Sequence, residues 1–367
     1  MEEIYKIALS FINGFGPVNI KKAIAYTGGI EGFFKEKTQH LQKIPGIGQV
    51  FTKKLNRESA LKSAEEELRF ISDNNIRFTS YLDPNYPQRL LNCSDSPCTL
   101  YYKGDIDFNS TRSISIVGTR NASDNGREIC NKLIADLSEK KTKTTIISGL
   151  AYGIDICAHK AALRNNMPTV AALGHGFHQM YPAQHKQYAS EIIKSGALLS
   201  EFTSKSNFDP KHFVRRNRII AGMSDATIVI ESANKGGSLV TANIANSYNR
   251  DVFAFPGRVT DKFSMGCNHL IKTNQAHLIE SVKDLEYILG WDDECEIPKE
   301  IQTKLFVELS TEEEKIVNSL KEEKNTPIDI ICIKTSLPMS KVSTILLKLE
   351  FDGIVKSLPG KIYALNS

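Results

Sequence analysis

The chain has 367 residues, of which 41% are hydrophobic and 24% charged, a composition typical of a globular protein with two or three domains. Its 46 basic and 42 acidic residues leave a net charge of +4, which excludes a histone-like polycation but permits a local basic cleft. No apolar run is long enough to span a bilayer, and the acidic N-terminus does not resemble a signal peptide, so we expect a cytoplasmic protein without membrane contact.

The cysteine and histidine spacings give no metal-binding motif. The seven cysteines form no CxxC pair and no zinc spacing, and we expect them to be reduced and packed as small hydrophobic side chains. His175, His178 and His185 lie near one another in the sequence, but not with the spacing of a HExxH site. A metal ion at these three histidines is the less favoured alternative, and we expect no metal ion and no other cofactor.

Residues 1–80 are predicted to form a helical domain. Within it, residues 12–22 and 44–54 each contain a glycine–hydrophobic–glycine turn that opens a helix with basic residues one turn later. Both segments resemble the helix-hairpin-helix motif of SAM-like domains, in which backbone N–H groups can face a phosphate. Such a turn can equally serve as a scaffold or as a protein-docking element. The acidic run at residues 65–67 is expected to lie on a solvated helix face.

Residues 81–290 alternate short apolar runs with helical patterns, which predicts a doubly wound, Rossmann-like parallel α/β sheet. The predicted strands are residues 113–117, 144–148, 169–173, 197–200, 226–231 and 252–255. Two of the helices between them are predicted at residues 126–138 and 239–248. Residues 81–112 are expected to form an extension that leads into the sheet.

Residues 301–367 are predicted to form a winged-helix domain that follows a polar linker at residues 292–300. A capping box at residues 310–313 opens its first helix. A short helix is predicted after Pro327, and a longer one at residues 341–350.

A small hairpin completes the predicted winged helix. Residues 353–355 and 361–365 flank the turn signal Pro359-Gly360. Three lysines of this domain could touch DNA or could form a solvated face, and the sequence leaves both possibilities open. They are Lys341, Lys348 and Lys361.

Residues 213–224 are the most informative segment of the chain. Arg215, Arg216 and Arg218 are followed at once by an apolar run at residues 219–221. Arginine is a permanently charged, fork-shaped donor that suits phosphate. The pattern predicts a helix that starts at a binding cleft and then enters a core. A solvated basic turn that leads into a core helix would have the same sequence.

Glycine-rich loops follow three of the predicted strands, at the sheet edge where ligands of α/β proteins bind. In chain order they contain Gly118, Arg120 and Ser123, then Ser148 and Gly149, and finally Gly236, Gly237 and Ser238. The last loop opens a helix, whose N–H groups and dipole suit an anion. None of the loops has the Walker or GxGxxG order. Together with the arginine run, they predict a site for a polyanion.

These segments together resemble the DNA-processing protein A (DprA/Smf) family. The matching stretches span residues 80 to 285 in order: 117–120 with Ser123 and Gly126, 148–155 with Ala158 and His159, 173–176 with Tyr181 and Pro182, 199–201, 213–224, 236–242, 255–257 and 266–271. The helical and winged-helix regions fit the longer members of the family. Two positions depart from its pattern, because Phe177-His178 stand where the family often has an aspartate and Gly236 stands where it often has serine.

The resemblance implies a protein that binds single-stranded DNA without catalysing a reaction. Members of the family protect incoming strands during natural transformation and load the RecA recombinase onto them. They typically act as dimers through the Rossmann-like domain. We therefore expect single-stranded DNA, RecA and a second copy of the chain as partners.

The resemblance also implies a role for each motif residue. Gly118, Arg120 and Ser123 would hold backbone phosphate, with Ser148 and Gly149 lining the same pocket. Further charge would come from Lys211, Arg215, Arg216 and Arg218, with Asn217 among them, and the anion site would be closed by Gly236, Gly237 and Ser238. Phe213 would either stack on bases or be a buried core ring.

An enzyme is the main alternative. The loop layout more distantly resembles the lysine-decarboxylase-like phosphoribohydrolases, which split nucleotide monophosphates. Asp155 with His159, and Glu201 or Glu231, could act as general acid or base. Otherwise Asp155 caps a helix and the two glutamates pair with arginines. A transcription factor that acts through the winged helix is disfavoured, because residues 301–367 carry no basic excess.

Overall fold

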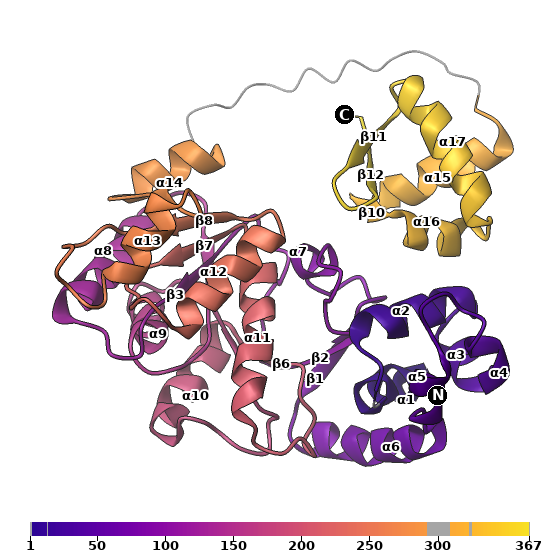
Figure 1. Ribbon diagram of the computed structural model, residues 1–367, viewed down its shortest axis with the longest axis horizontal. Helices are drawn as coiled ribbons and strands as arrows, with labels where there is room; N and C mark the ends of the chain where they lie inside the picture. The colour runs from indigo at the N-terminus through magenta and orange to yellow at the C-terminus, as the bar shows by residue number, and fades with distance from the viewer. Residues whose placement is uncertain (1, 13, 292–308, 323–324, 367) are drawn as a thin grey trace. The chain divides into compact units, whose positions relative to one another are not determined.

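The computed structural model describes residues 2–12, 14–291, 309–322 and 325–366 (Figure 1). The chain divides into two compact units, one of residues 1–20 with 45–294 and the other of residues 21–44 with 295–367. The predicted linker at residues 292–300 lies outside the described residues. The domain boundaries after residues 80 and 290 remain predictions.

The N-terminal part of the chain is helical, as predicted. Its helices are α1 (Glu2–Ala8), the 3-10 turn η1 (Leu9–Phe11), α2 (Pro17–Tyr26), α3 (Ile30–Lys35), α4 (Thr38–Leu41), α5 (Gln49–Lys53) and α6 (Arg57–Asp73). Both predicted glycine turns precede a helix. Gly14, before α2, has φ of 81°, and Gly46, before α5, has φ of 85°. Only glycine adopts this left-handed backbone without strain, so the two turns depend on it.

Helix α6 departs from the expected solvated acidic face at one position. Glu65 and Glu66 are exposed, but Glu67 is buried, with 2% of its surface accessible. Its carboxylate accepts hydrogen bonds from Ser204, which lies 137 residues later in the chain. A partner so distant in sequence leaves no local pattern, so the expectation of solvation is wrong for Glu67.

A nine-stranded sheet forms the centre of the larger unit, in the order β1-β2-β6-β5-β4-β3-β7-β8-β9. The strands are β1 (Arg77–Ser80), β2 (Thr99–Gly104), β3 (Arg112–Val117), β4 (Thr144–Ser148), β5 (Thr169–Ala172), β6 (Ala197–Ser200), β7 (Ala226–Val229), β8 (Asp251–Ala254) and β9 (His277–Leu278). Strands β3 to β9 pair in parallel. The predicted doubly wound parallel sheet is therefore confirmed.

Two antiparallel strands extend the sheet beyond its predicted edge. Strand β2 pairs with β6, and β1 pairs with β2 from Arg77↔Tyr102 to Ser80↔Thr99. The sequence placed β1 in the helical region and β2 in an extension, because each segment is too short to show a clear period of two. The segment from α1 to η1 packs on this added edge, where the Tyr101 hydroxyl donates to Ser10 at 3.0 Å.

Helices cover both faces of the sheet (Figure 1). They are α7 (Gln88–Leu91), α8 (Asp124–Ser138), α9 (Ile154–Arg164), η2 (Ala183–His185), α10 (Lys186–Ser195), α11 (Pro210–Gly222), α12 (Gly237–Ser247), α13 (Met265–Lys272) and α14 (Val282–Leu289). Ile114 and Ile116 of β3 pack in one core cluster with α8, α9 and α14. On the opposite face, the Ser224 hydroxyl after α11 donates to Ser115 at 3.2 Å. Small side chains on that face let α11 lie close to the strands.

The C-terminal region is a winged helix, as predicted. It contains α15 (Thr311–Glu322), β10 (Thr326–Pro327), α16 (Ile328–Thr335), α17 (Met339–Phe351), β11 (Val355–Leu358) and β12 (Ile362–Leu365), with the strands in the order β10-β12-β11. The capping box is confirmed, since the Ser310 N–H donates to the Glu313 carboxylate at 2.8 Å and the Glu313 N–H donates to the Ser310 hydroxyl at 3.4 Å.

Two lysines of the winged helix are engaged by acidic residues of α15. Lys341 pairs with Glu312, and Lys348 pairs with Glu313 at 2.7 Å. The hydrogen bond from the Lys348 ammonium has the largest effect on the pKa of the Glu313 carboxyl, and the N–H and hydroxyl of Ser310 act in the same direction. Together they lower this pKa to about 2. Because a glutamate of the same domain neutralises each lysine, these pairs favour the solvated-face alternative for Lys341 and Lys348. DNA contact by the winged helix remains a prediction.

No single helix among the described residues is long and apolar enough to cross a bilayer. Helices α16 and α17 meet the length and composition only as a pair, and the pair is bent by 110°. Their buried apolar residues, among them Ile331 and Leu346, form the core of the winged helix with α15.

Candidate functional site

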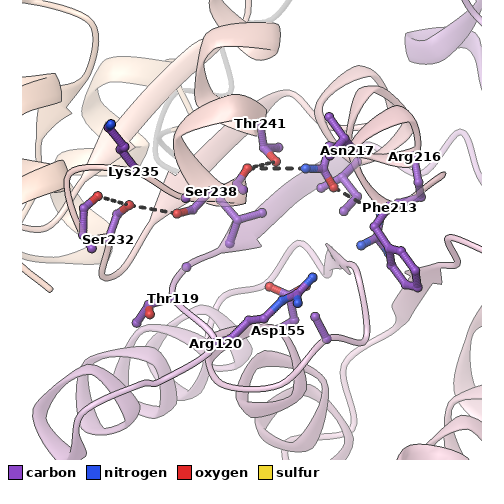
Figure 2. Close-up of a pocket in the computed structure, with 18 of the residues that line it drawn as sticks. Thr119, Arg120, Asp155, Phe213, Arg216, Asn217, Ser232, Lys235, Ser238 and Thr241 are labelled. Carbon is purple, nitrogen blue, oxygen red and sulfur yellow. Dashed lines mark hydrogen bonds between the residues drawn. The ribbon is translucent and has the colours of Figure 1, made fainter. Parts of the chain in front are cut away.

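A pocket of about 370 Å³ opens at the carboxyl edge of the sheet, beside the neighbouring strands β3 and β7 (Figure 2). Strands β4, β5 and β6 follow β3 in the chain and lie on one side of it in the sheet. After β6, helix α11 connects to β7, which lies on the other side of β3. This reversal is the point where ligands of doubly wound sheets bind. The pocket walls are the loops after β3 and β7, the start of α9 and one face of α11.

The N-terminal end of α12 forms one wall of the pocket. The first N–H groups of a helix have no acceptor within the helix and carry a partial positive charge. Side chains hold this turn in place, since Ser238 Oγ donates to Ser232 Oγ at 2.9 Å and Asn217 Nδ2 donates to the Gly237 carbonyl at 3.3 Å. The geometry of the turn therefore suits an anionic group.

Arg216 contributes a buried positive charge to the same pocket. Only 3% of its surface is exposed, and Nη1 donates to the carbonyls of Gly149, at 2.7 Å, and Ala172. Burial lowers the pKa of Arg216 to about 10, against the attraction of Asp155. Burial likewise raises the pKa of Asp155, while Arg216 and the N–H groups of Ala151 and Gly149 oppose that shift. The guanidinium therefore remains charged at neutral pH.

Gly149 makes room for this charged pair. A Cβ atom at position 149 would lie 2.5 Å from Arg216 Nη2 and 2.6 Å from Asp155 Oδ2. Both distances are shorter than any tolerable contact, and both neighbours are held by the surrounding fold. The glycine of the loop after β4 is therefore needed for packing behind the pocket rather than for a turn.

Helix α11 presents a continuous face to the pocket. The Asp209 side chain caps the helix by accepting from the Lys211 N–H at 2.8 Å, and Pro210 occupies the first turn. Residues 210, 213, 214, 217 and 220 all line the pocket, and their spacing is that of one helix face. The prediction of a helix that starts at a cleft and then enters a core is confirmed, because residues 216–222 are buried.

Two exposed cations complete the electrostatics of the pocket. In Figure 2, Lys235 lies at the left and Arg120 below the pocket. Within the part of the chain that the structure describes, neither side chain takes part in an ion pair. Arg120, Arg216 and Lys235 together carry three positive charges against the single carboxylate of Asp155, which leaves the pocket with a net charge of +2.

Three aromatic rings meet beside the pocket. The Phe213 ring centroid lies 5.4 Å from that of Tyr181 and 5.6 Å from that of Phe208, and the Tyr181–Phe208 distance is 5.1 Å. Tyr181 is 42% exposed and Phe208 is 49% exposed. We call these three residues the aromatic cluster. The sequence identifies Phe213 but gives no role to Tyr181 or Phe208, because these two residues lie in separate loops.

The pocket brings together eight of the residues predicted to bind DNA: Gly118, Arg120, Phe213, Arg216, Asn217, Gly236, Gly237 and Ser238. The other six do not line it: Ser123, Ser148, Gly149, Lys211, Arg215 and Arg218.

Most of those six have another structural role. Ser123 caps α8 by accepting from the Gly126 N–H at 3.0 Å, and Ser148 Oγ donates to the Ile116 carbonyl at 2.6 Å. Lys211 is exposed near the start of α11. A DNA contact by any of the six remains a prediction.

Glu201 engages the two remaining arginines. Its Oε2 atom accepts from Arg215 Nη2 at 2.6 Å and from Arg218 Nη2 at 2.5 Å. The expected pairing of this glutamate with arginines is therefore confirmed. The same expectation is wrong for Glu231, which accepts from the hydroxyl and the N–H of Ser123 instead.

The histidines form no metal cluster. Among the described residues, no three His, Cys, Asp or Glu side chains are grouped as metal ligands. His175 Nε2 accepts from the Tyr181 N–H at 3.1 Å, and His185 Nδ1 contacts the Leu150 carbonyl at 2.8 Å. Burial lowers the pKa of His159 to about 3, so this residue is neutral and poorly suited to supply a proton.

Comparison with known proteins places these features in one family. A family model described as DNA recombination-mediator protein A matches residues 77–289, and a model of the DprA winged-helix domain matches residues 307–361. Protein Smf of Synechocystis is 32% identical over 99% of this chain and 98% of its own length.

Two solved structures are similar as well. DNA processing protein A of Streptococcus pneumoniae has a TM-score of 0.64 and 32% identity, over 78% of this chain and 96% of that chain. DNA processing protein A of Helicobacter pylori, solved to examine its binding of single-stranded DNA, has a TM-score of 0.52 and 26% identity, over 59% of this chain and 97% of that chain.

Proposed function

Because the chain belongs to the DNA recombination-mediator protein A family, we propose that it binds single-stranded DNA as a recombination mediator and catalyses no reaction. The observation that carries the proposal is the pocket beside β3 and β7, where three cations and the N-terminus of α12 adjoin the exposed aromatic cluster. A single strand offers a flexible phosphate chain and unpaired bases, and the two halves of the site suit these two components.

Phosphate contacts supply most of the affinity. A backbone phosphate bound at the α12 turn accepts hydrogen bonds from the N–H groups, while Arg120 and Lys235 approach from the solvent side. Arg216 adds a charge that is already desolvated by the fold, so its attraction is little screened by salt. None of these groups reads a base, and binding is expected to be nearly independent of sequence.

Bases stack on the aromatic cluster. An exposed ring next to a phosphate site is a platform on which every base can stack, since each base has a π-face. The T-shaped contacts among the three rings hold Tyr181 and Phe208 in place while leaving part of each ring accessible. Duplex DNA hides its base faces and cannot use this half of the site.

The proposal predicts a preference for single strands that depends on salt. Fluorescence anisotropy of a labelled oligonucleotide should show tight binding at low salt, with log affinity falling by about 0.7 per log unit of salt for each phosphate contacted. The matching duplex should bind more weakly at every salt concentration. Binding that favours one duplex sequence, or no binding to single strands at 50 mM salt, would contradict the proposal.

The absence of catalysis is part of the proposal. Each carboxylate considered as a general acid or base is engaged: Asp155 by Arg216 and the loop after β4, Glu201 by two arginines, and Glu231 by Ser123. Asp155 is the only one of the three that lines the pocket, and an acid engaged in this way suits a site that binds phosphate rather than one that cleaves a glycosidic bond. Release of a base from nucleoside monophosphates by the purified protein would favour the phosphoribohydrolase alternative.

The family also supports proposals about partners. We propose that the protein is a cytoplasmic homodimer through its Rossmann-like domain, that it protects incoming strands during natural transformation, and that it loads RecA onto them. Light scattering should then give about twice the monomer mass of 40.9 kDa. RecA filament growth on strands covered by a single-strand-binding protein should start earlier when the protein is added. A monomer, or unchanged filament growth, would contradict these proposals.

A further inference from the structure

The buried carboxylate of Glu67 fixes the segment that connects β6 to α11. Glu67 accepts two hydrogen bonds from the Ser204 N–H, at 2.9 and 3.1 Å, and a third from the Ser204 hydroxyl at 2.5 Å. Its neighbour Glu66 pairs with Lys205. Hydrogen bonds to an ionised carboxylate are among the stronger ones in proteins. Helix α6 therefore holds residues 204 and 205 from outside the α/β sheet.

The held residues form a tight turn. The Ser206 N–H donates to the Thr203 carbonyl at 3.1 Å, and the hydroxyls of the same two residues lie 3.2 Å apart. The Thr203 carbonyl also lies directly against Gly176, where any Cβ atom would collide with it. The turn is thus confined between α6 on one side and the loop after β5 on the other.

The turn leads within a few residues to the aromatic cluster. Phe208 follows Ser204 by four residues, and its ring contacts Tyr181 and Phe213. Asp209 then caps α11, the helix that lines the pocket. Because so little chain separates them, the position of Ser204 limits where the Phe208 ring can lie.

We infer that Glu67 is a positioning residue for DNA binding, through which α6 raises single-strand affinity by holding Phe208 in the aromatic cluster. The inference rests on the proposed function. A ring on a loop that is free to move must be ordered when a base stacks on it, and that ordering weakens binding. The three hydrogen bonds to Ser204 order the loop before DNA arrives.

The inference gives the helical region a part in binding that is separate from its glycine turns. The carboxylate of Glu67 repels phosphate and is buried, so it cannot act as a phosphate ligand. Its removal should therefore weaken stacking on Phe208 and leave the phosphate contacts, and hence the salt dependence, unchanged.

A double-mutant cycle in the full-length chain tests the inference. The variants are Glu67→Ala, Phe208→Ala and the combination, with Glu65→Gln as a matched control on the exposed face of the same helix. Phe208→Ala should weaken single-strand binding by about five- to a hundredfold. Glu67→Ala should weaken it by about three- to tenfold. The combined variant should bind no more weakly than Phe208→Ala alone, because both changes act on one ring.

Two further readouts separate positioning from a general loss of structure. An oligonucleotide with 2-aminopurine should lose less fluorescence on binding to Glu67→Ala than on binding to the wild-type protein, because stacking quenches this base. The salt slope should be the same in both proteins. Glu67→Gln, which keeps the shape and one acceptor, should recover part of the affinity, and its thermal unfolding shows whether the fold survives.

The outcomes distinguish this inference from the proposed function. If the wild-type protein does not bind single strands, the proposed function fails and the role of Glu67 fails with it. If the wild-type protein binds and Glu67→Ala binds equally well, only the positioning role is overturned. Effects of Glu67→Ala and Phe208→Ala that add independently, or a shallower salt slope in Glu67→Ala, also overturn it.

Discussion

Replacing Arg120 and Lys235 together by alanine should weaken single-strand binding by roughly 10- to 100-fold at moderate salt, to the same degree for every sequence. Both cations are exposed and line the pocket, Lys235 just before the α12 turn and Arg120 in the loop after β3, and neither is committed to an ion pair among the described residues. Their loss removes two phosphate contacts. The slope of log affinity against log salt should therefore fall by about 1.4.

Each single variant, Arg120→Ala or Lys235→Ala, needs a control that lowers the net charge by the same one unit outside the pocket. Lys194 is exposed near the end of α10, and helices that follow parallel strands end at the amino edge of the sheet, opposite the pocket. Lys194→Ala should keep the affinity and slope of the wild-type protein. If it loses as much affinity as Arg120→Ala or Lys235→Ala, binding reflects overall charge and the pocket assignment fails.

Arg216→Met should both destabilise the α/β unit and abolish phosphate binding in the pocket. The substitution keeps a long side chain but leaves the Asp155 carboxylate buried without its cation, which typically costs about 3–5 kcal/mol in the free energy of unfolding. It also removes the donor from the carbonyls of Gly149 and Ala172. Urea denaturation can be followed through Trp291, the single tryptophan, which is partly buried, contacts Arg112 and packs against the core cluster of β3, α8, α9 and α14.

Adding Asp155→Asn to Arg216→Met separates stability from binding. The neutral amide no longer needs a cation, so the double variant should recover part of the lost unfolding free energy. It should not recover affinity for single strands, because the charge in the pocket is still missing. If the double variant regains both stability and affinity, Arg216 acts only as a structural residue and not as part of the phosphate site.

The arginine run at residues 215–218 shows which features of the site could be predicted from the sequence and which could not. Three arginines ahead of an apolar run predicted the helix and its entry into a core, and this is confirmed. The sequence did not separate their roles. Successive positions of a helix point about 100° apart, so Arg216 turns into the pocket while Arg215 and Arg218 turn toward Glu201. That division depends on tertiary neighbours rather than on local pattern.

The parallel sheet and its glycine loops were predictable because each strand and turn carries a local signal. The aromatic cluster and the Glu67–Ser204 contact were not. Tyr181 and Phe208 come from loops on either side of β6, and Glu67 lies in a helix before the sheet begins. Contacts over such sequence distances follow from how the elements pack, and a single sequence has no period that reveals them.

Gly149, which lies against the Arg216–Asp155 pair, limits how the sequence of this protein can change during evolution. Position 149 cannot accept another residue while Arg216 and Asp155 keep their places, so selection for folding alone would preserve it. Arg120 and Lys235 face solvent and support no part of the core, so only selection for ligand binding would retain them. In a lineage whose protein no longer bound its ligand, Arg120 and Lys235 would be substituted first. Gly149 would be retained, because the fold would still require it.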